Sequence, residues 1–253
     1  MFEQKRFVAI ISLNKRDKVQ IHHFTAGGVL KMNSSIFLLF LLPLQALGKN
    51  LLESGKNETR KGPTLPYFAS IFIDDAWFCA GTFILTRHIL TSAHCVDGGT
   101  YFDVSLGGQE QSSIDAVIHP NYNPTTFSAD LAVIRLPLNP NVESATLPSR
   151  GEVLQEGDSV CMDNLDDTFV CRPVMSDLDC NAVFGPEDIV CVEQSHGELC
   201  DAVNSGAPGV VADDGGPWTL AGVMALSSSA GCEVGLPVGF TRLENYIDWI
   251  NGL

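Results

Sequence analysis

Short runs of β-forming residues recur between residues 67 and 241, and they constrain the fold more than any other feature of the chain. Turn-forming residues separate the runs, and no helical pattern lies between them. Many short strands at regular spacing predict an all-β sandwich or barrels. The expected strands cover residues 67–73, 82–85, 89–91, 102–106, 116–118, 131–136, 170–174, 189–192, 209–212, 220–226 and 238–241.

The C-terminus departs from this β pattern. Leu243, Tyr246, Ile247 and Ile250 fall at the i, i+3, i+4 and i+7 positions of one helical face. This spacing predicts a single amphipathic helix, which Trp249 would dock onto the β-structure. The acidic, turn-rich stretch 139–157 is expected to connect two halves of the β-structure.

Composition places the chain among globular proteins and argues against one class of partner. Its 253 residues are 45% hydrophobic and 18% charged, which suits a buried core rather than a disordered chain. The chain has 15 Lys and Arg against 30 Asp and Glu, for a net charge of −15. The basic surface of a nucleic-acid binder is therefore missing, and no nucleic-acid partner is expected.

The segment from Met32 to Gly48 has the composition of a secretory signal. A short polar start precedes an apolar run at 36–42, and Ala46 and Gly48 give a small-x-small cleavage pattern. The run is too short to span a bilayer, so cleavage after Gly48 and no membrane contact afterwards are expected. Residues 1–31 show no clear apolar periodicity and are interpreted as lying upstream of the real start at Met32. A cytoplasmic tail before a signal anchor is the alternative.

Removal of residues 1–48 would leave a secreted, extracellular chain of net charge −19 that holds all eight cysteines. An oxidising compartment favours four disulfides among them. No Cys-x-x-Cys pair or His cluster with zinc spacing occurs, so neither a metal nor a cofactor is expected. Asn57 begins an Asn-Glu-Thr glycosylation sequon, as a secreted surface loop allows. The cysteines are Cys79, Cys95, Cys161, Cys171, Cys180, Cys191, Cys200 and Cys232.

Six motifs occur in a fixed order along residues 66–253. They are Phe-Cys-Ala-Gly-Thr at 78–82, Thr-Ser-Ala-His-Cys at 91–95, His-Pro-Asn-Tyr at 119–122, Asp-Leu-Ala-Val-Ile-Arg-Leu at 130–136, Asn-Ser-Gly-Ala-Pro at 204–208, and Pro-Val-Gly-Phe-Thr-Arg at 237–242. In this order they resemble the chymotrypsin-like (S1) serine proteases. The resemblance implies two antiparallel six-stranded β-barrels and a C-terminal α-helix at 66–253, preceded by an N-terminal segment at 49–65.

The resemblance also implies a catalytic triad of His94, Asp130 and Ser205. A serine hydroxyl needs an imidazole to take its proton, and the imidazole needs a buried carboxylate that fixes its tautomer. The His-Asp-Ser order differs from the Ser-Asp-His order of α/β-hydrolases, whose Gly-x-Ser-x-Gly motif is missing.

Two departures from the family pattern concern activation and the oxyanion hole. In the family, a new Ile-Val-Gly-Gly terminus pairs with the aspartate before the serine. Here residues 52–57 read Leu-Glu-Ser-Gly-Lys-Asn, and Asn204 precedes Ser205. The oxyanion hole uses backbone N–H groups of the serine and of a glycine two residues before it. That glycine is replaced by Val203, which tolerates a positive φ poorly, and the loop from Cys200 is one residue longer.

A third departure alters the substrate cleft. Ala225, Leu226 and Ser227 replace the family's Ser-Trp-Gly segment, and Val238 replaces a small residue of the specificity pocket. Glu198 aligns with the pocket base, where it could attract a basic side chain or lie as a solvated loop acid.

By resemblance, Cys79 pairs with Cys95, Cys180 with Cys191, and Cys200 with Cys232. Cys161 and Cys171 remain, and they would join adjacent strands of the second barrel.

Two functional classes follow from these motifs. The first is a secreted serine endopeptidase that acts on a protein or peptide substrate. The second is a non-catalytic serine protease homologue that binds another secreted protein. A monomer is expected in both cases.

Overall fold

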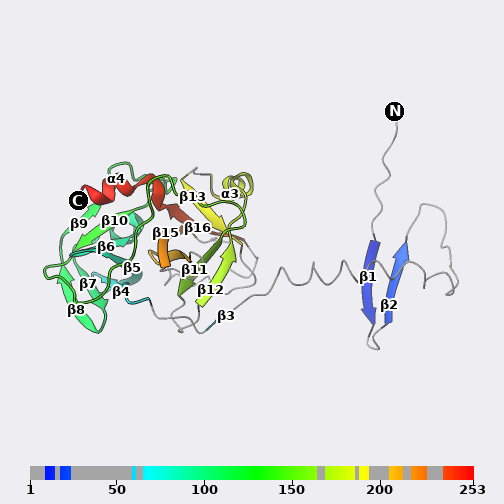
Figure 1. Ribbon diagram of the computed structural model, residues 1–253, viewed down its shortest axis with the longest axis horizontal. Helices are drawn as coiled ribbons and strands as arrows, with labels where there is room; N and C mark the ends of the chain where they lie inside the picture. Colours follow the sequence, from blue (N-terminus) through cyan, green and yellow to red (C-terminus); the bar gives the residue numbers. More distant parts are fainter. Residues whose placement is uncertain are drawn as a thin grey trace. The chain divides into compact units, whose positions relative to one another are not determined.

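The computed structural model describes residues 9–14, 18–23, 59–60, 65–163, 169–185, 188–193, 205–212, 218–226 and 236–253. The chain divides into two compact units, residues 1–56 and residues 57–253. In the first, strands β1 (Ala9–Asn14) and β2 (Lys18–His23) form an antiparallel hairpin in which Ala9 pairs with His23. Figure 1 shows this hairpin in blue. It lies in the stretch for which the sequence predicts no regular element.

The second unit holds two curled antiparallel sheets, as the resemblance predicts (Figure 1). The first sheet has the strand order β8-β7-β4-β5-β6-β10-β9. Its strands are β4 (Phe68–Ile73), β5 (Trp77–Leu85), β6 (His88–Thr91), β7 (Phe102–Leu106), β8 (Gln109–Ser113), β9 (Ala116–Ile118) and β10 (Ala132–Arg135).

The second sheet has the strand order β13-β16-β15-β14-β11-β12-β3. Its strands are β3 (Thr59–Arg60), β11 (Ser159–Asp163), β12 (Phe169–Pro173), β13 (Ile189–Val192), β14 (Pro208–Ala212), β15 (Trp218–Leu226) and β16 (Val238–Arg242). Each sheet thus has seven described strands, where six were predicted. Of the strands in these two sheets, the sequence prediction missed β8, β11 and β3.

Alternating burial explains how the first sheet encloses a core. In β4, Ala69, Ile71 and Ile73 are fully buried while Phe72 on the opposite face is exposed, and β7 alternates in the same way. β5 differs because every residue from Cys79 to Ile84 is buried. A strand that is covered on both faces reads as a continuous apolar run. β5 therefore lies inside the domain, where it reaches the site described below.

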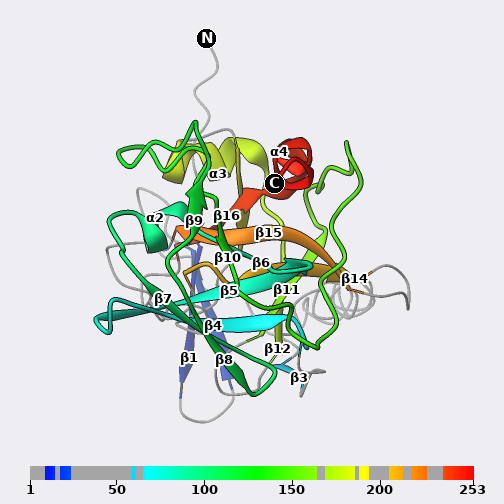
Figure 2. The ribbon, with the colours of Figure 1, turned by 90° about the vertical axis from the view of Figure 1, so that its left-hand side faces the viewer.

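The described part of the domain has few helices. α3 (Asp177–Phe184) and α4 (Ile247–Asn251) lie at the same end of it in Figures 1 and 2. The 3₁₀-helix η3 (Leu243–Asn245) leads into α4, so the predicted C-terminal helix is confirmed. The prediction that no helix lies between the strands is wrong, because α3 joins β12 to β13. A short α2 (Ala93–Val96) follows β6.

The connection between the two sheets packs against both of them. The Ala145 N–H donates to the Phe83 carbonyl of β5, and the Leu220 N–H of β15 donates to the Thr146 carbonyl. Residues from both sheets share one buried cluster, which includes Leu131 of the first half and Val223 of the second. The two halves therefore pack as one domain, and the residues of the candidate active site described below lie between them.

Candidate active site

His94 is held in place by the elements on either side of it. It lies in α2, directly after β6, and Cys95 beside it forms a disulfide with Cys79 of β5. The Thr91 hydroxyl donates to the Ala80 carbonyl at 2.7 Å, which fixes the end of β6 to β5. The imidazole side chain keeps 24% of its surface exposed, so it can reach a substrate.

Asp130 orients His94 through two hydrogen bonds. One carboxylate oxygen accepts from the His94 backbone N–H at 2.8 Å, and the other contacts His94 Nδ1 at 2.7 Å. Asp130 is fully buried, and an ionised carboxylate can only accept hydrogen bonds. Nδ1 therefore carries the proton, which leaves the Nε2 lone pair available as a base. The Cys95 sulfur, 3.8 Å from Nε2, is in a disulfide and has no proton to donate.

Backbone hydrogen bonds of Ser205 and of the next residue connect the serine to the elements around His94. Its carbonyl accepts from the Ala80 N–H at 2.8 Å. The next residue, Gly206, donates from its N–H to the Met224 carbonyl of β15 at 2.9 Å, and the Ser92 hydroxyl donates to that same carbonyl at 2.7 Å. Because Ser92 begins the turn that carries His94, these bonds bring residues 205–206, β5, β15 and α2 together.

Gly206 makes this arrangement possible. Its φ is +81°, a conformation that L-residues rarely adopt. A Cβ at this position would lie 2.2 Å from the Ala80 oxygen and 2.3 Å from Thr91 Oγ1. Only glycine therefore allows the serine loop to approach β5 and β6 this closely.

Aromatic side chains border the His94–Asp130 pair. The Phe127 ring meets the His94 ring edge to face, with centroids 5.8 Å apart. Burial raises the pKa of Tyr122 to about 12, with a smaller contribution from the negative charges of Asp130 and Asp97. This tyrosine therefore stays protonated and does not compete as a base near neutral pH.

Several predicted site residues lie in strands of the second sheet or outside the described residues. Ala225 and Val238 are both buried, and Val238 packs with Val190 and Val192. Leu226 ends β15. The predicted residues that fall outside the described part are Asn57, Glu198, Cys200, Val203, Asn204, Ser227 and Cys232.

The disulfides of the described part match three of the four expected pairs. Cys79 joins Cys95, Cys161 joins Cys171, and Cys180 joins Cys191. Cys161 and Cys171 are directly opposite each other on β11 and β12, with Cα atoms 3.9 Å apart. Cys180 on α3 is joined to β13 by its bond to Cys191, which anchors the unexpected helix.

Sequence reasoning missed the buried polar residues beside His94 that tie its turn to β5 and β15. Thr91 and Ser92 are completely buried, yet each hydroxyl has a backbone acceptor. Their position two and three residues before the histidine was a usable signal, because buried hydroxyls need hydrogen-bond partners. The Met224 carbonyl could not be found this way, since a backbone acceptor leaves no mark on residue type.

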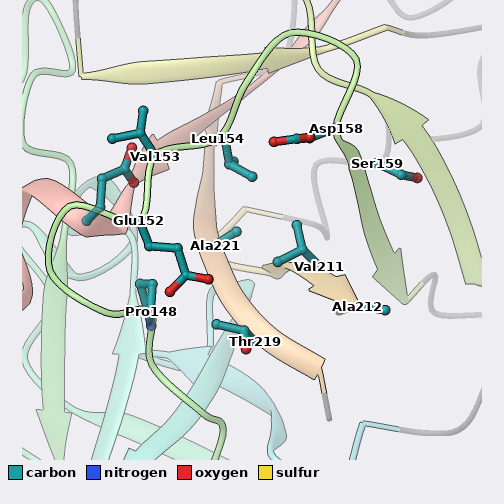
Figure 3. Close-up of a pocket in the computed structure, with 11 residues that line it drawn as sticks. Pro148, Glu152, Val153, Leu154, Asp158, Ser159, Val211, Ala212, Thr219 and Ala221 are labelled. Atoms are coloured by element: carbon teal, nitrogen blue, oxygen red, sulfur yellow. The ribbon is translucent and has the colours of Figure 1, made fainter. Parts of the chain in front are cut away.

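The described residues include no cluster of His, Cys, Asp and Glu that could hold a metal ion. Among the described helices, none is long and apolar enough to cross a membrane. A cavity of about 230 Å³ lies between the inter-sheet connection and strands β11, β14 and β15 (Figure 3). It is lined by Pro148, Glu152, Val153, Leu154, Asp158, Ser159, Val211, Ala212, Thr219, Ala221 and Glu244. None of these residues was a predicted site residue.

Comparison with known proteins agrees with this arrangement. Residues 54–250 match the family model described as Trypsin. The chain belongs to the trypsin family. This trypsin-family protein is 36% identical to brachyurin from Leptuca pugilator over 216 residues, which cover 73% of this chain and 91% of brachyurin. It is 31% identical to a collagenase from Hypoderma lineatum over 198 residues, 68% of this chain and 75% of that protein.

Solved structures give the same assignment. The structure titled HL collagenase at 1.7 Å resolution superposes with a TM-score of 0.64 at 29% identity and covers 78% of this chain and 96% of that one. The fold and family expected from the six motifs are therefore confirmed. The family match begins at residue 54 and the compact unit at Asn57, and strand β3 pairs with β12. Part of the stretch 49–65 therefore packs with the domain.

Proposed function

We propose that this chain is a secreted serine endopeptidase, with Ser205 as nucleophile, His94 as general acid and base, and Asp130 as the group that orients His94. The observation that carries the proposal is the buried Asp130 carboxylate bound to His94 Nδ1 at 2.7 Å, on a turn whose Ser92 shares the Met224 carbonyl with Gly206, the residue after Ser205. The substrate class is a protein or peptide, as expected for a trypsin-like protease.

The reaction would proceed by acyl transfer. The Ser205 hydroxyl gives its proton to His94 Nε2 while its oxygen bonds to the substrate carbonyl carbon. Asp130 stabilises the resulting imidazolium, which then protonates the leaving amine as the peptide bond breaks. A water molecule next loses a proton to His94 Nε2 as its oxygen bonds to the acyl carbon. His94 then returns this proton to the Ser205 oxygen as the acyl–serine bond breaks, which releases the acid and restores Ser205.

A fluorophosphonate probe tests this proposal, because it phosphonylates a serine only when that serine is activated. The chain from Lys49 to Leu253 should be labelled at Ser205, and Ser205→Ala should abolish labelling. Asp130→Asn should slow labelling and ester hydrolysis by about 10⁴-fold, since the amide would favour the wrong imidazole tautomer. An unlabelled but folded wild-type protein would reject the catalytic role.

The serine loop favours a second candidate, a homologue that binds another secreted protein without cleaving it. Val203 and Asn204 replace the residues that form and order the oxyanion hole in the family. Loss of one oxyanion donor typically lowers kcat by about 10²–10³-fold. Labelling of Ser205 without measurable peptide turnover would support this candidate, and turnover that Ser205→Ala removes would exclude it.

The substrate preference proposed for the enzyme rests on Glu198 and Val238. A glutamate at the pocket base attracts a basic side chain, whereas the bulk of Val238 shortens the pocket. A short basic residue before the cleaved bond is therefore favoured. Ester substrates with ornithine, lysine or arginine at that position should be hydrolysed in this order of decreasing kcat/KM, and Glu198→Gln should lower all three rates.

A further inference from the structure

Asp130 lies in a tight turn whose first residue has an unfavourable conformation. Ala129 has a φ of +50°, in the left-handed region that non-glycine residues seldom adopt. Its carbonyl accepts from the Leu131 N–H at 2.7 Å, so Asp130 stands at the centre of a three-residue turn. Such a conformation persists only where the surrounding structure holds it.

The group that holds Ala129 comes from the other half of the domain. The Ala129 N–H donates to Asp188 Oδ2 at 2.7 Å, and the Tyr246 hydroxyl donates to the same oxygen at 2.6 Å. Asp188 precedes β13 of the second sheet, and its carbonyl accepts from the Arg242 N–H of β16 at 2.9 Å. The Asp188 carboxylate thus joins Ala129, the first residue of the turn that holds Asp130, to the second sheet and to the C-terminal segment.

Tyr246 is suited to remain a donor in this contact. Burial, followed by the hydrogen bond to Asp188 and its negative charge, raises the pKa of Tyr246 far above its ordinary value. The hydroxyl therefore stays protonated and fixes the Asp188 carboxylate. His119 packs edge to face with the Tyr246 ring, with ring centroids 5.0 Å apart, which limits movement of the tyrosine.

We infer that Asp188 is a positioning residue, which holds Ala129 in the left-handed conformation and so aims the Asp130 carboxylate at His94. The inference rests on the proposed function in giving Asp130 its role. The hydrogen bonds of Asp130 demand accurate placement, because its two oxygens meet two different nitrogens of His94. A displacement of about 1 Å near reacting groups can lower a rate by about 10²-fold.

Three variants separate positioning from general stability. Asp188→Ala removes the acceptor for both donors, whereas Asp188→Asn keeps an oxygen that can accept from Ala129 and Tyr246. The double variant Ala129→Gly/Asp188→Ala lacks the same acceptor, but glycine adopts a positive φ without the steric cost. Recovery in the double variant would therefore identify the conformation of residue 129 as the property that Asp188 controls.

The first readout is the low-field proton NMR signal of His94 Nδ1–H, which requires no turnover. It should be sharp in the wild type and in Asp188→Asn, broadened in Asp188→Ala, and partly restored in the double variant. The second readout is the fluorophosphonate labelling rate, which should fall by about 10- to 100-fold in Asp188→Ala and recover several-fold in the double variant. If peptide turnover is measurable, kcat should fall and KM should change little.

The outcomes distinguish this inference from the proposed function. A wild type that is not labelled, but whose Nδ1–H signal depends on Asp188 as described, rejects the catalytic role and keeps the positioning role. An unchanged signal and labelling rate in folded Asp188→Ala would overturn the inference. So would a loss in Asp188→Ala that Ala129→Gly does not reduce. If Asp188→Ala does not fold, Tyr246→Phe, which removes one of the two donors to Asp188, should still broaden the same signal relative to the wild type, and an unchanged signal in folded Tyr246→Phe would overturn the inference.

Discussion

At the residue scale, two glycines with the same backbone angle have different surroundings. Gly206 and Gly151 both have a φ of +81°. Among the described residues, and apart from the glycine and its two chain neighbours, no heavy atom lies within 4 Å of the place where a Cβ on Gly151 would stand. A Cβ on Gly206 would instead overlap Ala80 and Thr91. The pair therefore separates the cost of backbone strain from the cost of lost space at the serine loop.

Alanine substitution at each glycine tests this difference. Gly151→Ala should lower the free energy of unfolding by about 1 kcal/mol, which is the strain of the left-handed conformation alone. Gly206→Ala should lower it by roughly 3 kcal/mol or more, because overlap with β5 and β6 is added to the strain. Urea denaturation of both variants measures the difference, and equal losses would show that the loop moves away from β5 without cost.

At the scale of elements, burial periodicity predicted most strands and failed where other interactions define a strand. β8 is polar and lies at the edge of its sheet, so it lacks an apolar signal. The sequence features that indicate helix α3 are its two capping residues. The Ser176 hydroxyl accepts from the Asp179 N–H at 3.2 Å, and Gly185 ends the helix with a φ of +86°. These capping residues could be recognised in the sequence. The apolar periodicity did not predict the helix, because its buried face is weakly apolar.

Some residues of the candidate site could likewise be predicted from the sequence and others could not. His94 and Asp130 are in contact as the six motifs implied, because each lies in one of these motifs, next to a strand. Asp188 carried no such signal. It is 59 residues from Ala129 and accepts from the backbone N–H there, so the residue type at position 129 reveals nothing. Its second donor, the Tyr246 hydroxyl, is 58 residues away in the sequence. Contacts of this kind arise only once the two sheets pack together.

The docking of the C-terminal helix should make stability depend on pH. The buried His119 ring packs edge to face on Tyr246 and Trp249, and its Nδ1 accepts from the Asn121 N–H. Burial lowers the pKa of His119, while the negative charge of Asp188 opposes the shift only in part. The unfolded chain therefore binds a proton, near its ordinary pKa of about 6.5, more readily than the folded one does.

Stability should consequently fall as the pH decreases from 7.5 to 5.5. His119→Gln should reduce the steepness of this fall, whatever its effect on stability at pH 7.5, because it removes the titrating group. Part of the slope should remain, since burial also lowers the pKa of His88. Urea denaturation at several pH values gives both slopes. A variant slope equal to that of the wild type would exclude His119 as a contributor.

At the scale of the whole molecule, the basic and acidic residues are unevenly divided. The last lysine is Lys61, and residues 65–253 contain five arginines against 26 acidic residues, a net charge of −21. Residues 1–61 contain ten basic and four acidic residues. The proposed signal cleavage therefore removes much of the positive charge of the chain.

Processing can be checked directly. Expression of the full chain in a secreting host should release a protein whose N-terminal sequence begins at Lys49 or within a few residues of it. The measurement is N-terminal sequencing of the purified secreted protein, with the cell-associated fraction as the comparison. Recovery of residues 1–31 in the exported protein would contradict both the start at Met32 and the cleavage after Gly48.

The charge of the domain should also make its stability depend on salt. Of the five arginines in residues 65–253, Arg172 and Arg242 are buried, so few cations offset the surface carboxylates. Repulsion among exposed charges weakens the folded state, and salt at 0.1 M largely screens the repulsion between charges more than about 10 Å apart. The melting temperature should therefore rise between 10 and 300 mM NaCl at pH 8.

Glu110 offers a local test of the same repulsion. It lines a surface groove together with Asp75 and Asp103, and its own side chain is exposed. Glu110→Lys should raise the melting temperature at 10 mM NaCl more than Glu110→Gln does, because reversing the charge adds attraction to the relief of repulsion. The gain of Glu110→Lys should shrink at 300 mM NaCl, where screening weakens both terms. A gain that is independent of salt, or a loss at 10 mM, would show that β-propensity or packing at this edge strand outweighs its charge.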